Sequence, residues 1–468
     1  MTALLPLMPQ FGSLIGIFLT SPITRAFGYK VTAQVMLMLS GAFICVPFFA
    51  KSVDHLLVGY FLQGIPWGVY QVVSPAYASE VASLQLRPIL TTWNNLCWVI
   101  GQLMAAAVGK GFEGIQGEKA YRVPFSLQWI FVAILLVAVS FAPESPYWYI
   151  QKNRLEDAKK SAKKLVRKGD DDLAEAKLAL MQRTIHQEKK EDHGADGSKW
   201  DIKRFGALFR GSDRRRTEIS AMTWIIQAVC GSSLIGWAPI LMQSAGLSQS
   251  DAFTINIAIP LAGLVGTLAS WWLMQGVGRR NIYLWGLVGM FGLLAACGFA
   301  SFAPPDKVGW AAGGILIVFT LVYDLTVGPI CYSIVSEIPS VRRRTPTLSI
   351  ARGSYLAINL VNGFLTPKMA SNESDAWGWG AKTGFFYAIL SALGAVYTWW
   401  RIPETKDLSA RELDILFHKR VKPGQFSRAK AAELDDRDPE EHADSDRSSL
   451  AGDRKSGLNA GAKTVERV

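Results

Sequence analysis

Cysteine and histidine are scarce in this chain of 468 residues, which contains five of each. No two cysteines have the CxxC spacing, so neither a disulfide framework nor a thiolate metal site is predicted. The patterns of a zinc protease, a phosphate-binding P-loop and a hydrolase nucleophile elbow are also missing. These absences argue against an enzyme, and we expect no metal and no cofactor.

Charged residues are nearly absent from long stretches, although they make up 19% of the chain. Apolar runs of about 20 residues suffice to cross the ~30 Å hydrocarbon core of a bilayer as helices. The sequence therefore predicts an all-α membrane protein with five spans, a charged insert and six further spans. The predicted spans are residues 3–23, 31–50, 56–79, 90–109, 125–143, 218–243, 252–275, 281–302, 308–335, 346–370 and 380–401.

The net charge of +11 raises the question of a nucleic-acid partner. The Lys and Arg residues instead gather in the insert and in the loops on its side of the membrane, which is the bias of cytoplasmic segments. We therefore expect no nucleic acid and place the insert and the C-terminus in the cytoplasm. The first residues lack the charged region and the small-residue cleavage site of a signal peptide.

The distribution of charge divides the chain into four parts. Residues 1–143 form an N-terminal bundle of five spans, and residues 217–401 form a C-terminal bundle of six. Between them, residues 144–216 are predicted to form a cytoplasmic linker with amphipathic helices. Residues 402–468 are predicted to be a largely disordered cytoplasmic tail, because most of this segment is too polar to build a core.

Three short motifs recur in the same order in both halves. "SEVASLQLR" matches "SEIPSVRRR", "FAPESPYW" matches "RIPETKDL" and "FGYK" matches "VGRR", each displaced by about 250 to 260 residues. Their recurrence predicts two related bundles, of which the first lacks a counterpart to span 218–243. The charged residues singled out by the motifs are Glu80, Arg87, Arg279, Arg280, Glu337 and Arg344.

These motifs resemble those of the sugar-porter branch of the major facilitator superfamily, over nearly the whole chain. The stretches "GIPWGVYQVVSPAYASEVASLQLRPILTTWNNLCWVIGQL" and "IIQAVCGSSLIGW" are most similar to fungal maltose and general α-glucoside permeases. The resemblance implies the twelve-helix fold of that superfamily, here without helix 1. It also implies a monomeric alternating-access carrier of the plasma membrane, with a sugar, membrane lipid and usually protons as partners.

The sequence departs from the family pattern at several positions. The missing first helix carries an acid linked to coupling in proton-coupled relatives. Arg25 and Gln275 replace the acids that usually begin the two loop motifs, and Tyr60 stands where an arginine is often found. Ala228 and Ser233 replace residues that bind hexose in relatives, which favours a differently shaped or larger substrate. Facilitated transport, altered coupling and an incomplete gene model stay open.

Polar and aromatic residues recur at helical spacing on three predicted spans. Sugar hydroxyls need amide and hydroxyl partners, while the C–H faces of the ring stack on aromatics. Such stripes predict a hydrated pathway, although polar residues also join membrane helices to each other. The stripes are Gln63, Trp67, Tyr70, Ser74 and Tyr77; Thr91, Asn95, Trp98 and Gln102; and Arg352, Tyr355, Asn359, Asn362 and Thr366.

The family resemblance narrows these stripes to a predicted substrate site. Gln102, Gln227 and Asn359 match sugar-binding amides of relatives, and Tyr332 stands at a tryptophan position after a Gly-Pro-Ile sequence. The predicted substrate-binding residues are Trp98, Gln102, Gln227, Ser233, Asp324, Tyr332, Tyr355 and Asn359.

Asp324 lies inside the apolar run 308–335, where a carboxylate is costly. Gly328 and Pro329 follow one turn later and are expected to break the helix, which frees backbone groups to line a cavity. We expect Asp324 to contact sugar hydroxyls or to take part in proton coupling. The alternative is an acid that is hydrogen-bonded to a neighbouring helix.

The six motif charges are predicted to form a cytoplasmic gate. Opposite charges at the helix ends of two bundles can pair when that side is closed and separate when it opens. The alternative is that they anchor helix ends to lipid headgroups. The leading hypothesis for the whole chain is an α-glucoside transporter with proton symport. Its alternatives are a hexose or polyol carrier, a sugar sensor that does not transport, and a truncated, inactive transporter.

Overall fold

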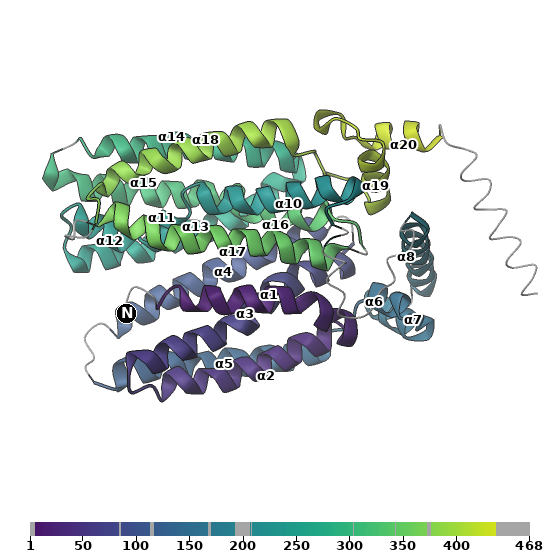
Figure 1. The fold of residues 1–468 in the computed structure, drawn as a ribbon, viewed down its shortest axis with the longest axis horizontal. Helices are drawn as coiled ribbons and strands as arrows, with labels where there is room; N and C mark the ends of the chain where they lie inside the picture. Colours follow the sequence, from purple (N-terminus) through teal and green to yellow (C-terminus); the bar gives the residue numbers. More distant parts are fainter. Residues whose placement is uncertain are drawn as a thin grey trace, which may run out of the picture.

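In the computed structural model, the regular secondary structure of the described residues is helical. These are residues 5–83, 86–112, 117–166, 170–191, 206, 208–302, 304–341, 343–371 and 376–436. Two bundles of long helices lie side by side with their axes roughly parallel, and shorter helices cover one end of them (Figure 1). We call this end, at which α6–α8 and α19 lie, the linker end.

The first bundle contains five long helices. They are α1 (Met8–Phe27), α2 (Tyr29–Phe48), α3 (Val53–Val81), α4 (Arg87–Gly111) and α5 (Lys119–Phe141). Ser52 begins α3 as an N-cap, because its hydroxyl accepts a hydrogen bond from the backbone N–H of His55 at 3.3 Å. Glycines allow α1 and α3 to pack closely: a Cβ at Gly12, Gly64 or Gly68 would overlap the backbone of the facing helix.

The second bundle contains six membrane-crossing units, two of which are interrupted. Its helices are α10 (Gly211–Val229), α11 (Ser233–Gly236), α12 (Ala238–Ser244), α13 (Gln249–Gly276), α14 (Arg279–Ala300), α15 (Pro305–Leu325), α16 (Val327–Glu337), α17 (Arg344–Ala370) and α18 (Thr383–Arg401), with a 3-10 turn, η2 (Gly380–Lys382). The unit α10–α12 has no counterpart among the described helices of the first bundle, which agrees with the five-plus-six count from the sequence.

The helix expected to break near Gly328 and Pro329 is interrupted at Thr326, just ahead of them. Thr326 has φ −126° and ψ −84°, outside the helical range, and it separates α15 from α16. Pro329 lacks the N–H that would bond to the carbonyl three to four residues back, and its ring crowds that carbonyl. The break therefore falls one turn before the proline.

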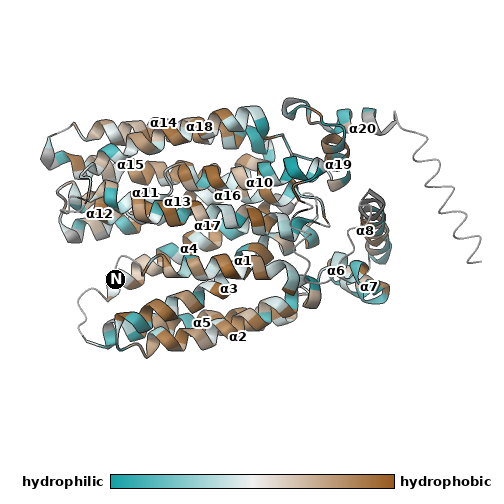
Figure 2. Cartoon of the chain, viewed as in Figure 1, coloured by the Kyte–Doolittle hydropathy of each residue, from teal (hydrophilic) through white to brown (hydrophobic). Residues whose placement is uncertain are grey.

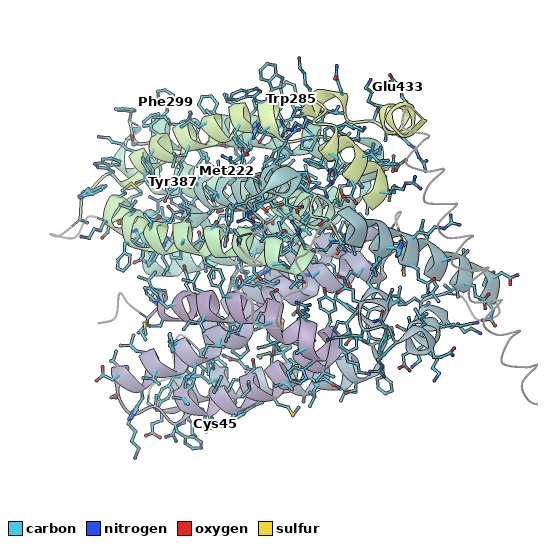
Figure 3. The ribbon with its side chains drawn as sticks, turned by 45° about the vertical axis from the view of Figure 1, so that its right-hand side comes forward. Cys45, Met222, Trp285, Phe299, Tyr387 and Glu433 are labelled. Carbon is cyan, nitrogen blue, oxygen red and sulfur yellow. The ribbon has the colours of Figure 1, made fainter. Side chains whose placement is uncertain are left out.

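The outer surface of the bundles is apolar, as a bilayer requires. Six of the described helices are long and apolar enough to cross a membrane by length and composition alone. The others carry more polar residues, among them the stripes on α4 and α17. Figure 2 shows hydrophobic residues along both bundles and hydrophilic ones at the linker end. Figure 3 shows Trp285 and Phe299 on the outer side of the second bundle, where both are exposed.

The linker end is covered by two groups of short helices. The linker forms α6 (Pro146–Gln151), α7 (Leu155–Lys164) and α8 (Asp171–Glu191); the C-terminal segment forms α19 (Ala410–His418), η3 (Pro423–Gln425) and α20 (Arg428–Asp436). Arg216 of α10 holds α19 by an ion pair with Asp414 at 2.5 Å and by stacking over Phe417 at 4.7 Å.

The tail was predicted to be largely disordered, and its first part differs from that prediction. Residues up to 436 are helical or packed, because Phe426 stacks edge-on against Phe417 with ring centroids 5.1 Å apart. The remainder of the predicted tail lies outside the described residues.

The bundles meet along several helix pairs. α4 of the first bundle packs against α13 and α16 of the second, and α1 packs against α17. Trp93 of α4 stacks on Trp271 of α13 with ring centroids 5.5 Å apart, and the indole N–H of Trp271 donates to Thr92 at 3.0 Å. These contacts place the polar faces of α4 and α17 at the junction of the bundles.

Candidate functional site

Two carboxylates cap equivalent helices at the linker end of the two bundles. Glu144 accepts hydrogen bonds from the backbone N–H groups of Tyr29 and Lys30, both at 2.9 Å, at the start of α2. Glu404 does the same for α14, accepting from the N–H groups of Arg279 at 2.8 Å and Arg280 at 3.2 Å. An anion at a helix N-terminus satisfies free N–H groups and complements the helix dipole. The glutamates of the repeated motifs thus cap equivalent helices in both halves.

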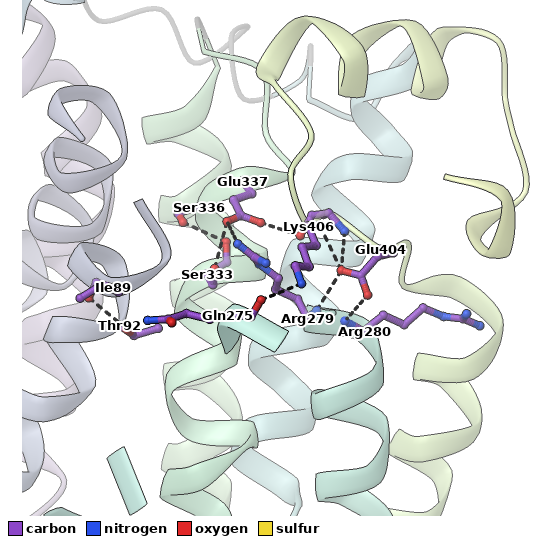
Figure 4. Close-up of polar contacts among 11 residues, drawn as sticks. Ile89, Thr92, Gln275, Arg279, Arg280, Ser333, Ser336, Glu337, Glu404 and Lys406 are labelled. Carbon is purple, nitrogen blue, oxygen red and sulfur yellow. Dashed lines mark hydrogen bonds and ion pairs between the residues drawn. The ribbon is translucent and has the colours of Figure 1, made fainter. Parts of the chain in front are cut away.

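The hydroxyl that follows each capping glutamate completes a second repeated contact. Ser145 donates to Glu80 at 2.5 Å, and Thr405 donates to Glu337 at 2.5 Å. Figure 4 shows the second-bundle network around Glu337, Arg279 and Glu404. The Glu80 and Glu337 carboxylates are therefore held by groups of their own half of the chain.

A second partner of Glu80 and of Glu337 differs between the halves. In the first bundle, the Tyr29 hydroxyl donates to Glu80 at 2.8 Å. In the second, the guanidinium of Arg279 pairs with Glu337 at 3.8 Å. Tyr29 and Arg279 both follow the glycine of the FGYK and VGRR motifs, so the repeat places a phenol where its partner half has a cation.

Burial changes the pKa of Glu144, the carboxyl that caps α2. Desolvation raises the pKa of the Glu144 carboxyl above its ordinary value, while the backbone N–H groups of Ser145, Lys30 and Tyr29 counteract part of that rise. The carboxyl lies directly against Gly28, where a Cβ would overlap its Oε2 atom. Gly28 also has φ +87°, which favours glycine.

Contacts between the bundles at the linker end run through Glu80 rather than through Arg279. The Tyr29 hydroxyl also contacts the Thr345 hydroxyl of α17 at 3.0 Å. The positive charge of the buried Arg344, next to Thr345, acts on the Glu80 carboxylate. These contacts link α2 and α3 of the first bundle to the start of α17.

The other predicted gate residues stay within their own bundle or lie outside the described atoms. The partner of Arg279, Glu337, belongs to the same bundle, and Arg280 donates to the carbonyl of Trp399 at 2.5 Å, also in that bundle. Arg87 begins α4, but its side chain lies outside the described part of the structure. The role of Arg87 in the gate stays a prediction.

A cluster of aromatic residues surrounds Trp224 in the interior of the second bundle. Tyr332 and Tyr355 meet its ring edge-on, with centroids 4.8 and 5.2 Å away. The guanidinium of Arg352 lies 4.1 Å from the rings of both Trp224 and Tyr355. Its Nε donates to Gln71 of the first bundle at 2.6 Å. Two predicted residues, Tyr332 and Tyr355, thus share one cluster that reaches the other bundle.

Gln227 lies one turn after Trp224 on α10. Its side-chain N–H donates to the backbone carbonyl of Gly328 at 3.2 Å, beside the break between α15 and α16. Ser233 contacts the hydroxyl of Tyr387, further along the same unit. Asn359 lies one turn after Tyr355 on α17 and is half-buried. The structure places Gln227 and Asn359 on helices that carry the aromatic cluster, and Ser233 on the adjoining α11.

Asp324 is buried and bonded to a neighbouring helix of the other bundle. Asn95 of α4 donates to its Oδ1 atom at 2.8 Å and to the hydroxyl of Thr267 at 3.1 Å. This contact is of the kind that the sequence left open as the alternative to sugar binding.

Trp98 and Gln102 extend the α4 face that carries Asn95. Helical spacing places the three residues on one side of α4. Trp98 is 47% exposed and Gln102 is also exposed, whereas Asn95 is buried against the second bundle. The predicted site is therefore packed on its second-bundle side and open at Trp98 and Gln102.

Sequence reasoning gave little weight to four residues that the structure makes central. Arg352 and Asn95 appeared only as members of stripes, although an arginine inside a membrane helix is itself a functional signal. Trp224 precedes Gln227 by one helical turn, which could have drawn attention to it. No pattern in the sequence singled out Gln71, because its role depends on contact with Arg352 across the bundles.

Comparison with solved structures identifies the fold of this arrangement of helices. The fold aligns with the proton:xylose symporter XylE bound to 6-bromo-6-deoxy-D-glucose, with TM-score 0.76, 21% identity and 89% of each chain covered. The inward-open form of XylE from E. coli aligns with TM-score 0.60, 20% identity and 88% of each chain covered. The fold is that of the major facilitator superfamily, which confirms the predicted fold class.

The sequence comparisons then give the family. The family model "Sugar (and other) transporter" matches residues 1–417. Maltose permease MAL31 of Saccharomyces cerevisiae is 36% identical over 448 residues, covering 92% of this chain and 71% of the permease. The general alpha-glucoside permease of the same species is 34% identical over 419 residues, covering 89% and 67%. The chain belongs to the sugar transporter family, and it is a multi-pass membrane transporter.

Proposed function

We propose that this chain carries an α-glucoside such as maltose across the plasma membrane by alternating access, as a monomer and with proton symport. The names of its yeast relatives support the substrate class, and the XylE symporter shares its fold. The excess of Lys and Arg in the insert supports a cytoplasmic linker end and C-terminus.

The aromatic cluster around Trp224 is the observation that carries this proposal. Within the described residues, Oε1 of Gln227 and Nη1 of Arg352 are buried without a hydrogen-bond partner. A buried polar atom without a partner is costly, and a bound hydroxyl would satisfy it. Tyr332 and Tyr355 pack against Trp224 in the same cluster, and aromatic rings supply the flat surfaces on which sugar rings stack. Polar atoms and aromatic faces together suit a polyhydroxylated ring.

The contacts at the linker end suit one state of an alternating-access cycle. Tyr29, Glu80, Thr345 and Arg344 join the bundles there, while Trp98 and Gln102 are exposed on α4. A carrier in this state holds its inner side closed. Breaking these few polar contacts would let the bundles separate at the linker end and release a sugar into the cytoplasm.

Uptake measurements test the substrate and the coupling. We expect uptake of radiolabelled maltose, and less of glucose, by a host without its own transporters, with faster uptake at pH 5 than at pH 7. Gln227→Leu should raise the KM for the sugar about tenfold, because it removes an amide that would bond to a hydroxyl. Gln243→Leu, at an exposed position of α12, is the control.

Each other outcome contradicts a named part of the proposal. Uptake of glucose or a polyol without any α-glucoside would favour the hexose or polyol carrier, and a flat pH response would favour facilitated transport. Correctly inserted protein without any uptake would favour a sensor or an inactive chain. A C-terminal epitope that antibodies reach without permeabilising the cell would contradict the orientation.

A further inference from the structure

Asn95 and Asp324 form a polar contact between the bundles deep inside the membrane. Asn95 lies on α4 of the first bundle, and its side-chain N–H group donates to Asp324 of α15 at 2.8 Å. The same nitrogen donates to Thr267 of α13 at 3.1 Å. The amide of one bundle is therefore inserted between a carboxyl and a hydroxyl of the other.

The surrounding helices are shaped to fit this carboxyl. A Cβ at Gly263 of α13 would overlap Oδ2 of Asp324. A Cβ at Gly328 of α16 would lie 3.1 Å from Oδ1 of Asp324 and 3.2 Å from Oδ1 of Asn95. Two glycines thus leave room for the acid and for its partner, and the cluster is closely packed on both sides.

The ionised form of Asp324 is stabilised mainly by the hydrogen bond from Asn95. The titratable groups that face it are Tyr323 on its own helix and Tyr332 on α16, while Asn95 and Thr267 are neutral. Among the described residues no cation acts on this carboxyl; the charge of Arg352 acts on Tyr332 instead. A buried carboxylate without a cation is stabilised mainly by its hydrogen-bond donors.

We propose that Asn95 and Asp324 are a proton-controlled latch between the bundles. While Asp324 is ionised, the charge-assisted hydrogen bond from Asn95 holds α4 against α13 and α15. When a proton from water binds a carboxyl oxygen, this bond becomes a weaker neutral one and the bundles separate more readily. Asn95 is then a positioning residue for Asp324. This inference rests on proton-linked transport and assigns that coupling to one contact.

A swap of the two side chains tests the latch. In Asn95→Asp/Asp324→Asn, the acid moves to the first bundle while a carboxyl still faces an amide. The matched control is Asn362→Asp/Asp324→Asn, because Asn362 is 5% exposed like Asn95 but donates within its own bundle, to the carbonyl of Ala228. Maltose counterflow into proteoliposomes with equal pH on both sides is measured between pH 5 and pH 8.

The latch predicts a distinct pH profile for each protein. The wild type should change rate several-fold over this range, and Asp324→Asn should change by less than about twofold, since its amide does not titrate. The swap should regain the pH dependence, and the Asn362 control should not. Wild-type pH dependence in Asp324→Asn, a flat profile in a folded swap, or recovery in both double variants would overturn the proposal. If the swap does not fold, the profile of Asp324→Asn decides.

A measurement without sugar separates this proposal from the proposed function. Spin labels at Val53→Cys of α3 and Phe302→Cys after α14, in a chain without its native cysteines, report the distance between the bundles by pulsed electron paramagnetic resonance; both positions are exposed. If the wild type carries no α-glucoside, the latch still predicts a pH-dependent distance distribution that Asp324→Asn abolishes. A distribution that does not change with pH in the wild type would overturn the latch.

Discussion

At the scale of single residues, a glutamate and a glycine define the linker end of each bundle. Glu144 and Glu404 cap α2 and α14, and the glycine just before each helix leaves space for the carboxylate. The geometry explains why both motifs pair these residue types: the acid supplies the acceptor, and any side chain on the glycine would displace it.

Replacement of Gly278 tests this explanation. In Gly278→Ala, the new Cβ would overlap Oε2 of Glu404, so the cap of α14 should be displaced. We expect a loss of about 1 to 3 kcal/mol in the free energy of unfolding, as for other lost helix caps with steric strain. Thermal unfolding in detergent measures it.

The control for this substitution is Gly276→Ala. A Cβ at Gly276 meets nothing within 4 Å, and the residue ends α13 just before the same loop. Equal unfolding temperatures for the two variants would show that the contact of Gly278 with Glu404 does not support the helix.

At the scale of elements, interrupted helices carry the candidate site. α10 ends at Val229 and is followed by α11 and α12, while α15 gives way to α16 at Thr326. Trp224, Gln227 and Tyr332 all lie within a few residues of these interruptions. The carbonyl of Gly328 accepts a hydrogen bond from Gln227, so backbone near a break joins two elements of the site.

A pH-dependent contact fastens α19 to α20. Ser409 and Glu412 form a capping box, with the N–H of Ser409 donating to Glu412 at 2.7 Å, and Arg428 pairs with Glu412 at 3.0 Å. Burial opposes ionisation of Glu412, but the hydrogen bonds and the charge of Arg428 outweigh it and lower the pKa of this carboxyl. Its contribution to stability is present above the ordinary pKa of about 4.3 and is lost as the pH falls through the lowered value.

Hydrogen exchange of the α19 amides checks this contact. At neutral pH, Glu412→Gln should exchange about fivefold faster than the wild type, corresponding to about 1 kcal/mol for a capping contact. The difference should disappear below the lowered pKa, where the wild type has lost the same charge. Glu433→Gln is the control, because Glu433 pairs with Lys430 on α20 and its side chain is more exposed than that of Glu412. A difference that persists in acid would contradict an ionic origin.

At the scale of the whole molecule, equivalent helices of the two bundles differ in how many of their residues are buried. No residue of the α5 span Tyr121–Phe141 is buried, whereas its counterpart in the repeat, α18, buries eight residues, among them Tyr387 and Thr398. Within the described residues the first bundle has no equivalent of α10–α12, which packs against α17 in the second. The exposed side chains of α4 and α5 follow from this difference.

The hydroxyl of Tyr29 contacts Glu80 of the first bundle and Thr345 of the second. Tyr29→Phe keeps the ring but removes the bonds to Glu80 at 2.8 Å and to Thr345 at 3.0 Å. Only the bond to Thr345 crosses between the bundles, and at about 1 kcal/mol for a neutral hydrogen bond we expect the population open at the linker end to rise about fivefold. Distances between spin labels across that end measure it.

Tyr77→Phe provides the comparison for this variant. Its hydroxyl donates to the carbonyl of Pro143 at 2.6 Å, within the first half of the chain, so its loss should leave the spacing between the bundles unchanged. Equal label distances in the two variants would show that Tyr29 does not help to hold the linker end closed.

The sequence by itself determined the membrane spans, the two related halves and the family, because apolar length and repeated motifs are local properties of the chain. It also identified Asp324 and Tyr355, since a carboxylate or a polar stripe in an apolar run is visible without a fold, and the family resemblance added Tyr332. Only the tertiary structure decided which side chains meet. Asp324 accepts a hydrogen bond from Asn95, Arg352 donates to Gln71, and Glu80 accepts from Tyr29, whereas its counterpart Glu337 pairs with an arginine. Each of these contacts joins residues far apart in the chain, and which side chains meet there depends on how the helices pack.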